Sequence, residues 1–232
     1  MTQRKYFPFI FLLTFFILSR AVFYMLGVRF ESTLFPQSFW HGVDLNFLTN
    51  DLWNSLFYLH TQPPMLNGLV GVVYKLFPQS QTIVFISVFL LFGGLLFYSL
   101  YKLLRLLGTT TKISTAITAV FMLYPANILY ENFLFYTYPV VALLCFSGVC
   151  YFNALKKETI KHWLLFFLVL VSIIYWRSLF HITWFIACYF LAIYLRPKNL
   201  KLITKAVVVP FLLVFCLFFK NWVVFGEFSS SS

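Results

Sequence analysis

Long apolar runs separated by short polar segments constrain this chain more than any other feature of its sequence. Runs of about 20 apolar residues recur along the chain, and they lack the strict alternation of transmembrane β-barrel strands. With 62% hydrophobic and 10% charged residues, the chain carries more apolar surface than a soluble core can bury. The sequence therefore predicts an all-α, polytopic membrane helical bundle, built as a single module over residues 1–232.

The basic residues indicate how the chain is threaded through the bilayer. The net charge of +11 is spread in clusters between the apolar runs, which is the positive-inside pattern, and we expect no nucleic-acid partner. The clusters are Arg4 and Lys5; Lys102, Arg105 and Lys112; Lys156, Lys157 and Lys161; and Arg196, Lys198, Lys201 and Lys205. Placing them all in the cytosol predicts a cytosolic N-terminus, an external C-terminus and about seven crossings.

This topology divides the chain into four parts. They are a first span (1–27), an outer loop (28–81), six further spans (82–222) and an outer tail (223–232). The six later spans are expected at 82–104, 113–129, 138–155, 162–176, 179–195 and 203–220. The tail ends in four serines, which fit either a flexible end or a chain cut from a longer protein.

Two helices are expected within the outer loop. Residues 44–59 carry leucines at helical spacing, which predicts one amphipathic helix lying on the membrane surface. Residues 65–77 follow two prolines and end at Pro78. At 1.5 Å per residue that run extends roughly 20 Å, too short for about 30 Å of hydrocarbon, so we expect an interfacial or re-entrant helix.

Acidic residues are scarce and gather on the outer side. The chain has six Asp and Glu, and the predicted topology leaves all except Glu158 outside the cytosol. On one helix, Asp44, Asp51 and Ser55 would lie within about 40° of each other, with His41 just before them. Asp44 could instead cap the helix, and Asp51 could be an ordinary polar-face residue.

Further candidates lie at other outer turns. Arg20 in the first span needs a carboxylate, a carbonyl or a phosphate as partner, unless it snorkels to the interface. Glu131 at the end of a span is expected to face a cavity or a partner. Arg177 and His181 are four residues apart, so one helical face could present both to a phosphate; anchoring at the interface is the alternative.

His60 belongs to a Pro-Pro turn, where a histidine more often has a structural role than a catalytic one.

No Walker motif, Gly-rich dinucleotide loop, nucleophile elbow or metal-ligand cluster occurs in the sequence. A divalent metal could still bind between Asp44 and Asp51, although nothing in the sequence requires it.

Three short segments resemble the GT-C glycosyltransferase superfamily, in particular the protein O-mannosyltransferase and lipid A aminoarabinose transferase group. They are Trp40-His41-Gly42-Val43-Asp44, His60-Thr61-Gln62-Pro63-Pro64-Met65, and Pro125 through Pro139. The order of span, outer loop with an Asp, and Pro-Pro turn before a short helix is similar as well. Members of that family usually have more spans, so the resemblance covers their N-terminal module.

The resemblance implies an enzyme that moves a sugar from a polyprenyl-phosphate donor to a lipid, glycan or protein acceptor at the non-cytosolic face. It implies Asp44 as the first-loop acid and Glu131 as the second, with Arg177, His181 and Arg20 on the donor phosphate. Asp51, His60 and His41 would support substrate binding. The family's second acid has no counterpart in Tyr136-Thr137-Tyr138-Pro139, which departs from the pattern.

Two other classes compete with the glycosyltransferase. A transporter or flippase of an anionic or lipid-linked substrate would show acids near the mid-bilayer and paired broken helices, and a non-catalytic assembly subunit would have the GT-C topology without activity. The sequence contains no Asn-x-Ser/Thr sequon, which favours a bacterial inner membrane over the endoplasmic reticulum.

Overall fold

The computed structural model describes residues 3–32 and 42–231, and the side chains of residues 3–6 are not among the described parts. Within these ranges the chain is α-helical, and strand-like pairing is confined to an isolated bridge between Glu31 and Phe133. The expectation of an all-α chain is confirmed.

Four helices in the described part of the chain are long and apolar enough to cross a membrane. They are α1 (Gln3–Met25), α6 (Gln81–Leu106), α9 (Thr137–Lys157) and α12 (Leu200–Phe225), the last preceded directly by the 3-10 helix η1 (Pro197–Asn199). A fifth span results if α7 (Thr111–Met122) and α8 (Pro125–Glu131) count as one span that bends by 62°. The chain is therefore a multi-pass membrane protein by length and composition.

Two further apolar helices are shorter than a usual span. α10 (Ile160–Trp176) has 17 residues and α11 (Ile182–Leu195) has 14. At 1.5 Å per residue they extend about 26 and 21 Å, less than the roughly 30 Å of a hydrocarbon core. Four or five spans follow from length and composition, and the count of seven stays a prediction.

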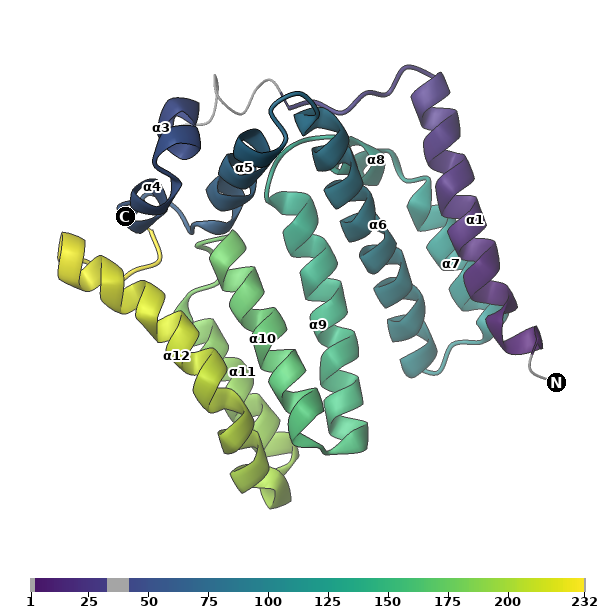
Figure 1. The fold of residues 1–232 in the computed structure, drawn as a ribbon. Helices are drawn as coiled ribbons and strands as arrows, with labels where there is room; N and C mark the ends of the chain where they lie inside the picture. Colours follow the sequence, from purple (N-terminus) through teal and green to yellow (C-terminus); the bar gives the residue numbers. More distant parts are fainter. Residues whose placement is uncertain (1–2, 33–41, 232) are drawn as a thin grey trace.

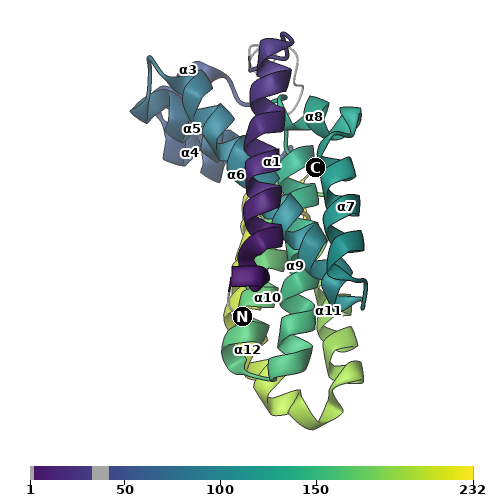
Figure 2. The same cartoon turned by 90° about the vertical axis from the view of Figure 1, so that its right-hand side faces the viewer.

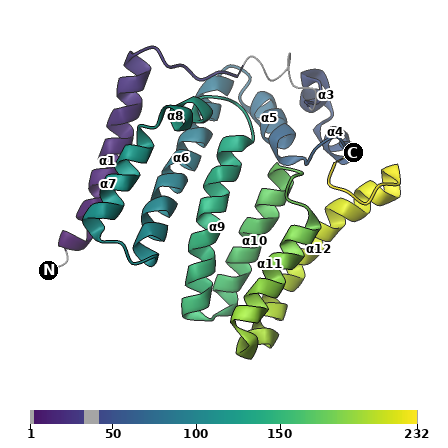
Figure 3. The same ribbon diagram turned by 180° about the vertical axis from the view of Figure 1, so that it is seen from behind.

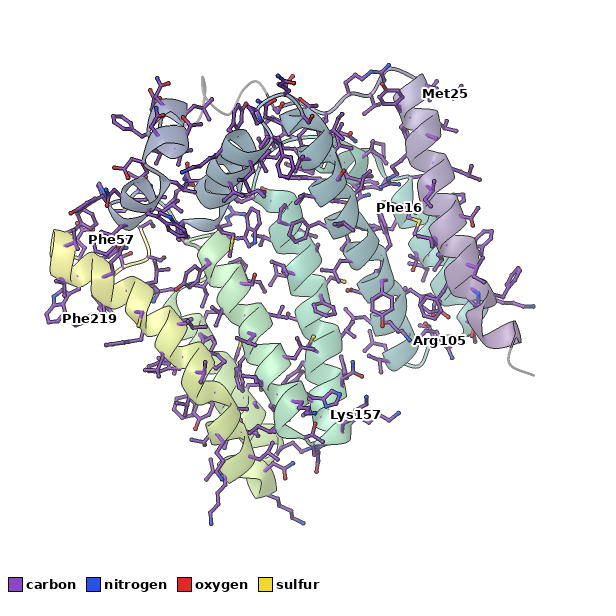
Figure 4. All side chains as sticks on the ribbon, viewed as in Figure 1. Phe16, Met25, Phe57, Arg105, Lys157 and Phe219 are labelled. Carbon is purple, nitrogen blue, oxygen red and sulfur yellow. The ribbon has the colours of Figure 1, made fainter. Side chains whose placement is uncertain are left out.

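The helices stand side by side in a row, so that successive connections alternate between two ends (Figures 1 and 3). Neighbouring pairs such as α6 with α9, α9 with α10, and α10 with α12 pack directly against each other. The connections α6–α7, α9–α10 and α11–α12 lie at one end, where Figure 4 labels Arg105 and Lys157. The basic clusters of these connections thus share one end of the molecule.

The opposite end carries the segment between α1 and α6. It contains α3 (Leu45–Asn50), α4 (Leu52–Phe57) and α5 (Met65–Leu76), which project to one side of the row (Figure 2). The expectation of one helix over residues 44–59 is wrong, because the chain turns at Asp51 (φ −139°, ψ 59°) and starts a second helix. α5 is too short to cross a bilayer, as the sequence predicts.

Aliphatic residues form most of the buried core, and large aromatic side chains pack among them. The larger cluster is centred on α6, α9, α10 and α12, and its fully buried side chains include Trp163, Phe167, Phe185 and Phe218. A separate small cluster joins α1, α6 and α7; it consists of Leu12, Phe16, Phe97, Tyr101 and Met122. Helix α1 therefore has its own apolar contacts rather than sharing the main core.

Candidate functional site

Arg20 and Glu131 form a buried, two-pronged ion pair between α1 and α8. The Arg20 Nε and Nη2 atoms donate to Glu131 Oε1 and Oε2 at 2.8 and 2.5 Å. Their side chains are 11% and 2% exposed. Such parallel bonds are the strongest geometry available to an arginine and a carboxylate, so both predicted site residues are engaged with each other.

The remaining polar atoms of this pair also have partners. Arg20 Nη1 donates to the Met122 carbonyl oxygen and to Ser19 Oγ, each at 3.0 Å. The Tyr138 hydroxyl donates to Glu131 Oε2 at 2.6 Å. A buried pair is tolerated only where such bonds compensate for lost solvation, and here the compensation comes from α1, α7 and α9.

Gly93 makes room for this cluster on α6. A Cβ at residue 93 would lie 2.9 Å from Glu131 Oε2 and 3.0 Å from the Tyr138 hydroxyl. The bend between α7 and α8 turns Glu131 back toward Arg20. The sequence predicted that Arg20 needs a partner and that Glu131 faces one, and the structure identifies each as the other's partner.

Asp44 caps the first outer helix. Its Oδ1 accepts a hydrogen bond from the Asn46 backbone N–H at 2.7 Å at the start of α3. The capping alternative for Asp44 is therefore confirmed, and the carboxylate is exposed to its surroundings. Asp44, Asp51 and Ser55 do not share one helical face, because the helix break at Asp51 intervenes.

Asp51 and His60 line one cavity of about 450 Å³ that opens widely to the surface. Asp51 accepts a hydrogen bond from the Asn54 side chain at 2.9 Å, and the His60 ring packs on Phe225 with centroids 4.5 Å apart. Other polar side chains on its wall are Asn54, Ser55, Tyr58 and Thr61, and Gly42 and Val43 complete one edge.

Asn67, a residue that sequence reasoning missed, joins the two segments that carry the family resemblance. It is fully buried in α5, and its Oδ1 accepts a hydrogen bond from the Val43 backbone N–H at 3.0 Å. The segment before Asp44 is thereby held against the helix that follows the Pro-Pro turn. An Asn inside an apolar helix is a signal, but its partner in a loop 24 residues earlier leaves no trace in the sequence.

Arg177 lies at the end of α10, beside the Pro-Pro turn. Its guanidinium carbon sits 5.1 Å from the centre of the Tyr136 ring, a cation–π arrangement. Arg177 and Tyr136 line a cavity of about 370 Å³ together with Thr61, Gln62 and Pro63. Thr61 belongs to this cavity and to the one that contains Asp51 and His60, so the two adjoin.

The expectation that Arg177 and His181 share a helical face is wrong. Arg177 ends α10 in an extended conformation, and His181 precedes α11, where its ring nitrogen caps the helix by accepting from the Thr183 N–H at 3.4 Å. The His181 ring packs edge-on against Phe218, with centroids 4.8 Å apart. His181 is absent from the wall of the Arg177 cavity because the turn between the two helices separates them.

Lys220 is a second residue that the sequence reading missed, having counted it only as the end of a span. Its Nζ donates to the carbonyl oxygens of Phe57 and Leu59 at 2.8 and 2.9 Å. These carbonyls lie at the end of α4 and just before His60, so Lys220 connects the C-terminal half of α12 directly to the outer segment. Its position among Phe218, Phe219 and Trp222 was the available signal.

His41 lies outside the described residues. Within residues 3–32 and 42–231 no group of three or more His, Cys, Asp or Glu is placed to hold a metal ion. No family model, no curated protein and no solved structure matches this chain.

Proposed function

We propose that this protein is an integral membrane glycosyltransferase that uses a polyprenyl-phosphate sugar at the non-cytosolic face. One observation carries the proposal: residues 42–43, residues 59–63 and Arg177 line two adjoining cavities, each of which carries polar side chains. The segments that resemble GT-C enzymes lie in that wall, and a cation stands beside them. A phosphate and a polar acceptor would thus bind next to each other.

In this proposal Arg177 binds the phosphate of the donor. A guanidinium offers paired N–H donors that match phosphate oxygens, and a partly buried site strengthens the bond. The position also suits a lipid-linked substrate, because α10 and α11 are apolar helices and their connection lies at the end away from the basic clusters. The polyprenyl chain stays in the bilayer while the phosphate reaches the cavity.

The acceptor binds in the adjoining cavity beside Asp51 and His60. An acceptor hydroxyl or amine attacks the anomeric carbon and a carboxylate removes its proton, while the bond to the donor phosphate breaks and its electron pair leaves with the phosphate. Direct attack inverts the anomeric centre. Asp51 lies on the wall of this cavity, and Asp44 follows Val43 at its edge. Both carboxylates are exposed, and we assign the base to Asp44 with Asp51 supporting acceptor binding.

Arg20 and Glu131 take a different part in the proposal from the one expected of them. Glu131 already accepts three hydrogen bonds from Arg20 and Tyr138, and Arg20 directs its paired Nε and Nη2 donors at Glu131 rather than at a phosphate. We therefore assign this pair to holding α1 on the bundle. It also holds the start of α9, where Tyr136 lies beside Arg177.

The proposed topology has seven crossings, with α10 and α11 as short spans and α7–α8 as a bent one. The shared end of the basic clusters supports a cytosolic placement of that end. Reporters fused after Lys112 and Lys157 should then be cytosolic, and one fused after Glu227 external. A cytosolic reporter after Glu227 would contradict both the prediction of seven crossings and the placement of the site on the outer face.

Purified protein in proteoliposomes tests the activity. The assay uses undecaprenyl-phosphate hexoses with a labelled sugar, and membrane extracts as a source of lipid, glycan and protein acceptors. Label should leave the donor with wild-type protein and stay on it with Asp44→Asn. Absence of turnover with wild type across the donor and acceptor panel argues against a glycosyltransferase, whereas equal turnover by the two proteins removes Asp44 as the base.

Transport is the second candidate, and the bend between α7 and α8 beside a buried Arg–Glu pair favours it. Among the described residues this is the only bent pair of apolar helices, whereas inverted-repeat transporters carry two. A flux assay separates the classes. A transporter moves the labelled donor across the bilayer without transfer, and a glycosyltransferase transfers the sugar without flux.

A further inference from the structure

Another cavity lies at the outer end of α1, away from the sites above. It measures about 640 Å³ and runs between α1, the segment after it, the first turns of α6 and the end of α8. Ala21, Ile83, Ile86 and Leu90 are among its apolar wall residues. The cavity shares no lining residue with those that contain Arg177 or Asp51, so it is a separate place for a ligand.

The packing of α1 explains why this cavity is open. The small cluster that joins α1 to α6 and α7 uses Leu12 and Phe16, in the half of the helix nearer the N-terminus. Beyond Arg20 the side chains of Val22, Tyr24 and Met25 are exposed, Met25 to 83%. In a bilayer no hydrophobic force closes such a gap, and an empty one forfeits dispersion contacts, so a lipid chain is its natural filling.

Arg29 lines the cavity and gives it a positive charge. Its guanidinium carbon lies 3.9 Å from the centre of the Tyr24 ring, and Nη1 donates to the carbonyl oxygens of Tyr24 and Val28. Among the described residues no carboxylate lies within ion-pair distance of Arg29. The charge of Arg20, the other cation on the wall, is compensated by Glu131, and none of the described residues that line the cavity is an Asp or Glu.

We infer that this cavity binds an anionic glycerophospholipid, with an acyl chain between α1 and α6 and the phosphate on Arg29. Apolar walls that end at an uncompensated arginine complement a lipid with an ionised head, and a guanidinium pairs readily with phosphate oxygens. Because no carboxylate base stands among the described residues of its wall, we infer that the lipid is held there and not converted. This inference does not depend on the glycosyltransferase activity, because it uses none of the same side chains.

Native mass spectrometry of the purified protein measures lipid retention after exposure to equal amounts of phosphatidylglycerol and phosphatidylcholine. Wild type should retain phosphatidylglycerol preferentially. Arg29→Ala should lower that retention about tenfold, the effect of one charge-assisted contact, and should leave phosphatidylcholine unchanged. Arg29→Lys should keep part of the preference, because the charge remains.

Arg105 supplies the matched control. It is also an exposed arginine whose Nη1 donates to a backbone carbonyl at a helix end, that of Thr109, but it lies at the opposite end of α6. Arg105→Ala should leave phosphatidylglycerol retention unchanged. Ala21→Trp fills the cavity without changing its charge, and should lower retention of both lipids.

Three results would overturn the inference. Arg29→Ala could retain phosphatidylglycerol as wild type does, or Arg105→Ala could lower retention equally, which would reduce the effect to overall charge. Undecaprenyl phosphate could also displace phosphatidylglycerol at equal concentration in wild type and fail to bind Arg29→Ala, which would make the cavity a donor site. The inference is supported if Arg29→Ala lowers phosphatidylglycerol retention, Arg105→Ala does not, and undecaprenyl phosphate fails to displace phosphatidylglycerol from wild type.

Discussion

Arg20 and Glu131 lie 111 residues apart in the sequence, yet their side chains form two parallel hydrogen bonds in the protein interior. The pair joins α1 to α8, and Tyr138 and the Met122 carbonyl extend it to α9 and α7. Four helices therefore meet at one charged contact, on an apolar background where a single unpaired charge is expensive.

Breaking this pair from one side should destabilise the protein strongly. Arg20→Ala or Glu131→Ala leaves an uncompensated charge, and we expect a loss of about 3–5 kcal/mol in unfolding free energy. The double variant Arg20→Met/Glu131→Leu should recover most of it. Thermal unfolding in detergent measures all three proteins.

A different outcome would return Glu131 to the catalytic role that the resemblance implies. In that case Glu131→Gln would abolish sugar transfer while the unfolding temperature stays at the wild-type value. Loss of activity that follows the loss of folded protein, by contrast, agrees with the holding role proposed here.

Two consecutive glycines on α6 test the space around the pair. Gly93→Ala would place a Cβ 2.9 Å from Glu131 Oε2 and 3.0 Å from both the Tyr138 hydroxyl and Phe16 Cζ, which forces the cluster apart. Overpacking of this kind costs about 1–3 kcal/mol. Gly94→Ala is the matched control, because a Cβ there has no neighbour within 4 Å, and it should stabilise the helix by roughly 0.5–1 kcal/mol. Equal stability of the two variants, measured by thermal unfolding, would contradict the observed packing.

Asp44 can be tested for charge and for capping separately. Asn caps helices as well as Asp does, so Asp44→Asn should keep α3 intact and abolish sugar transfer if the carboxylate is the base. Asp44→Ala should also lose the cap, worth about 1 kcal/mol. Transfer assays and thermal unfolding distinguish the two effects. Wild-type turnover by Asp44→Asn would limit Asp44 to the cap that the structure describes.

Much of the helical architecture follows from the sequence, because apolar runs and proline positions are local signals. The break at Asp51 does not, although Leu48 and Leu52 are both buried as the leucine stripe predicts. The periodicity continues across the break, and only Asn50 and Asp51, which favour caps and turns over helix interiors, mark it. The leucine periodicity correctly predicted that Leu48 and Leu52 are buried. The turn-forming preference of Asn50 and Asp51 explains why two short helices, rather than one long helix, bury them.

Candidate site residues were predicted less completely than the fold, for a related reason. The need of Arg20 for a partner is a property of one residue in an apolar span, so the sequence shows it. The choice of Glu131 depends on the bend between α7 and α8, and the separation of Arg177 from His181 depends on where α10 ends. Contacts of this kind arise from tertiary packing, which a single sequence does not encode at any fixed spacing.

Lys220 should control the order of the outer segment. Lys220→Met keeps most of the side-chain volume and removes the bonds to the Phe57 and Leu59 carbonyls, so residues 57–60 should become more accessible. Hydrogen exchange of those amides should speed up by about tenfold, since a bond from a charged donor contributes roughly 1.5–3 kcal/mol. Lys205→Met, an exposed lysine on the same helix, serves as the control. Unchanged exchange in Lys220→Met would show that the outer segment is held by other contacts.

Arg177 should determine donor affinity, and Tyr136 should act through it. Arg177→Ala removes the guanidinium beside the Pro-Pro turn, so binding of undecaprenyl-phosphate hexose should weaken by about ten- to a hundredfold, the range for a charge-assisted bond. Arg177→Lys should restore part of the affinity, because an ammonium is a point charge and lacks the paired N–H donors of a guanidinium.

Tyr136→Phe keeps the ring under Arg177 and should bind the donor like wild type. Tyr136→Leu should lose about two- to fivefold of affinity, as a cation–π contact of roughly 0.5–1 kcal/mol implies. His181→Asn preserves the helix cap outside this cavity and should leave affinity unchanged. Equal binding by wild type and Arg177→Ala in proteoliposomes would place the donor phosphate elsewhere in the molecule.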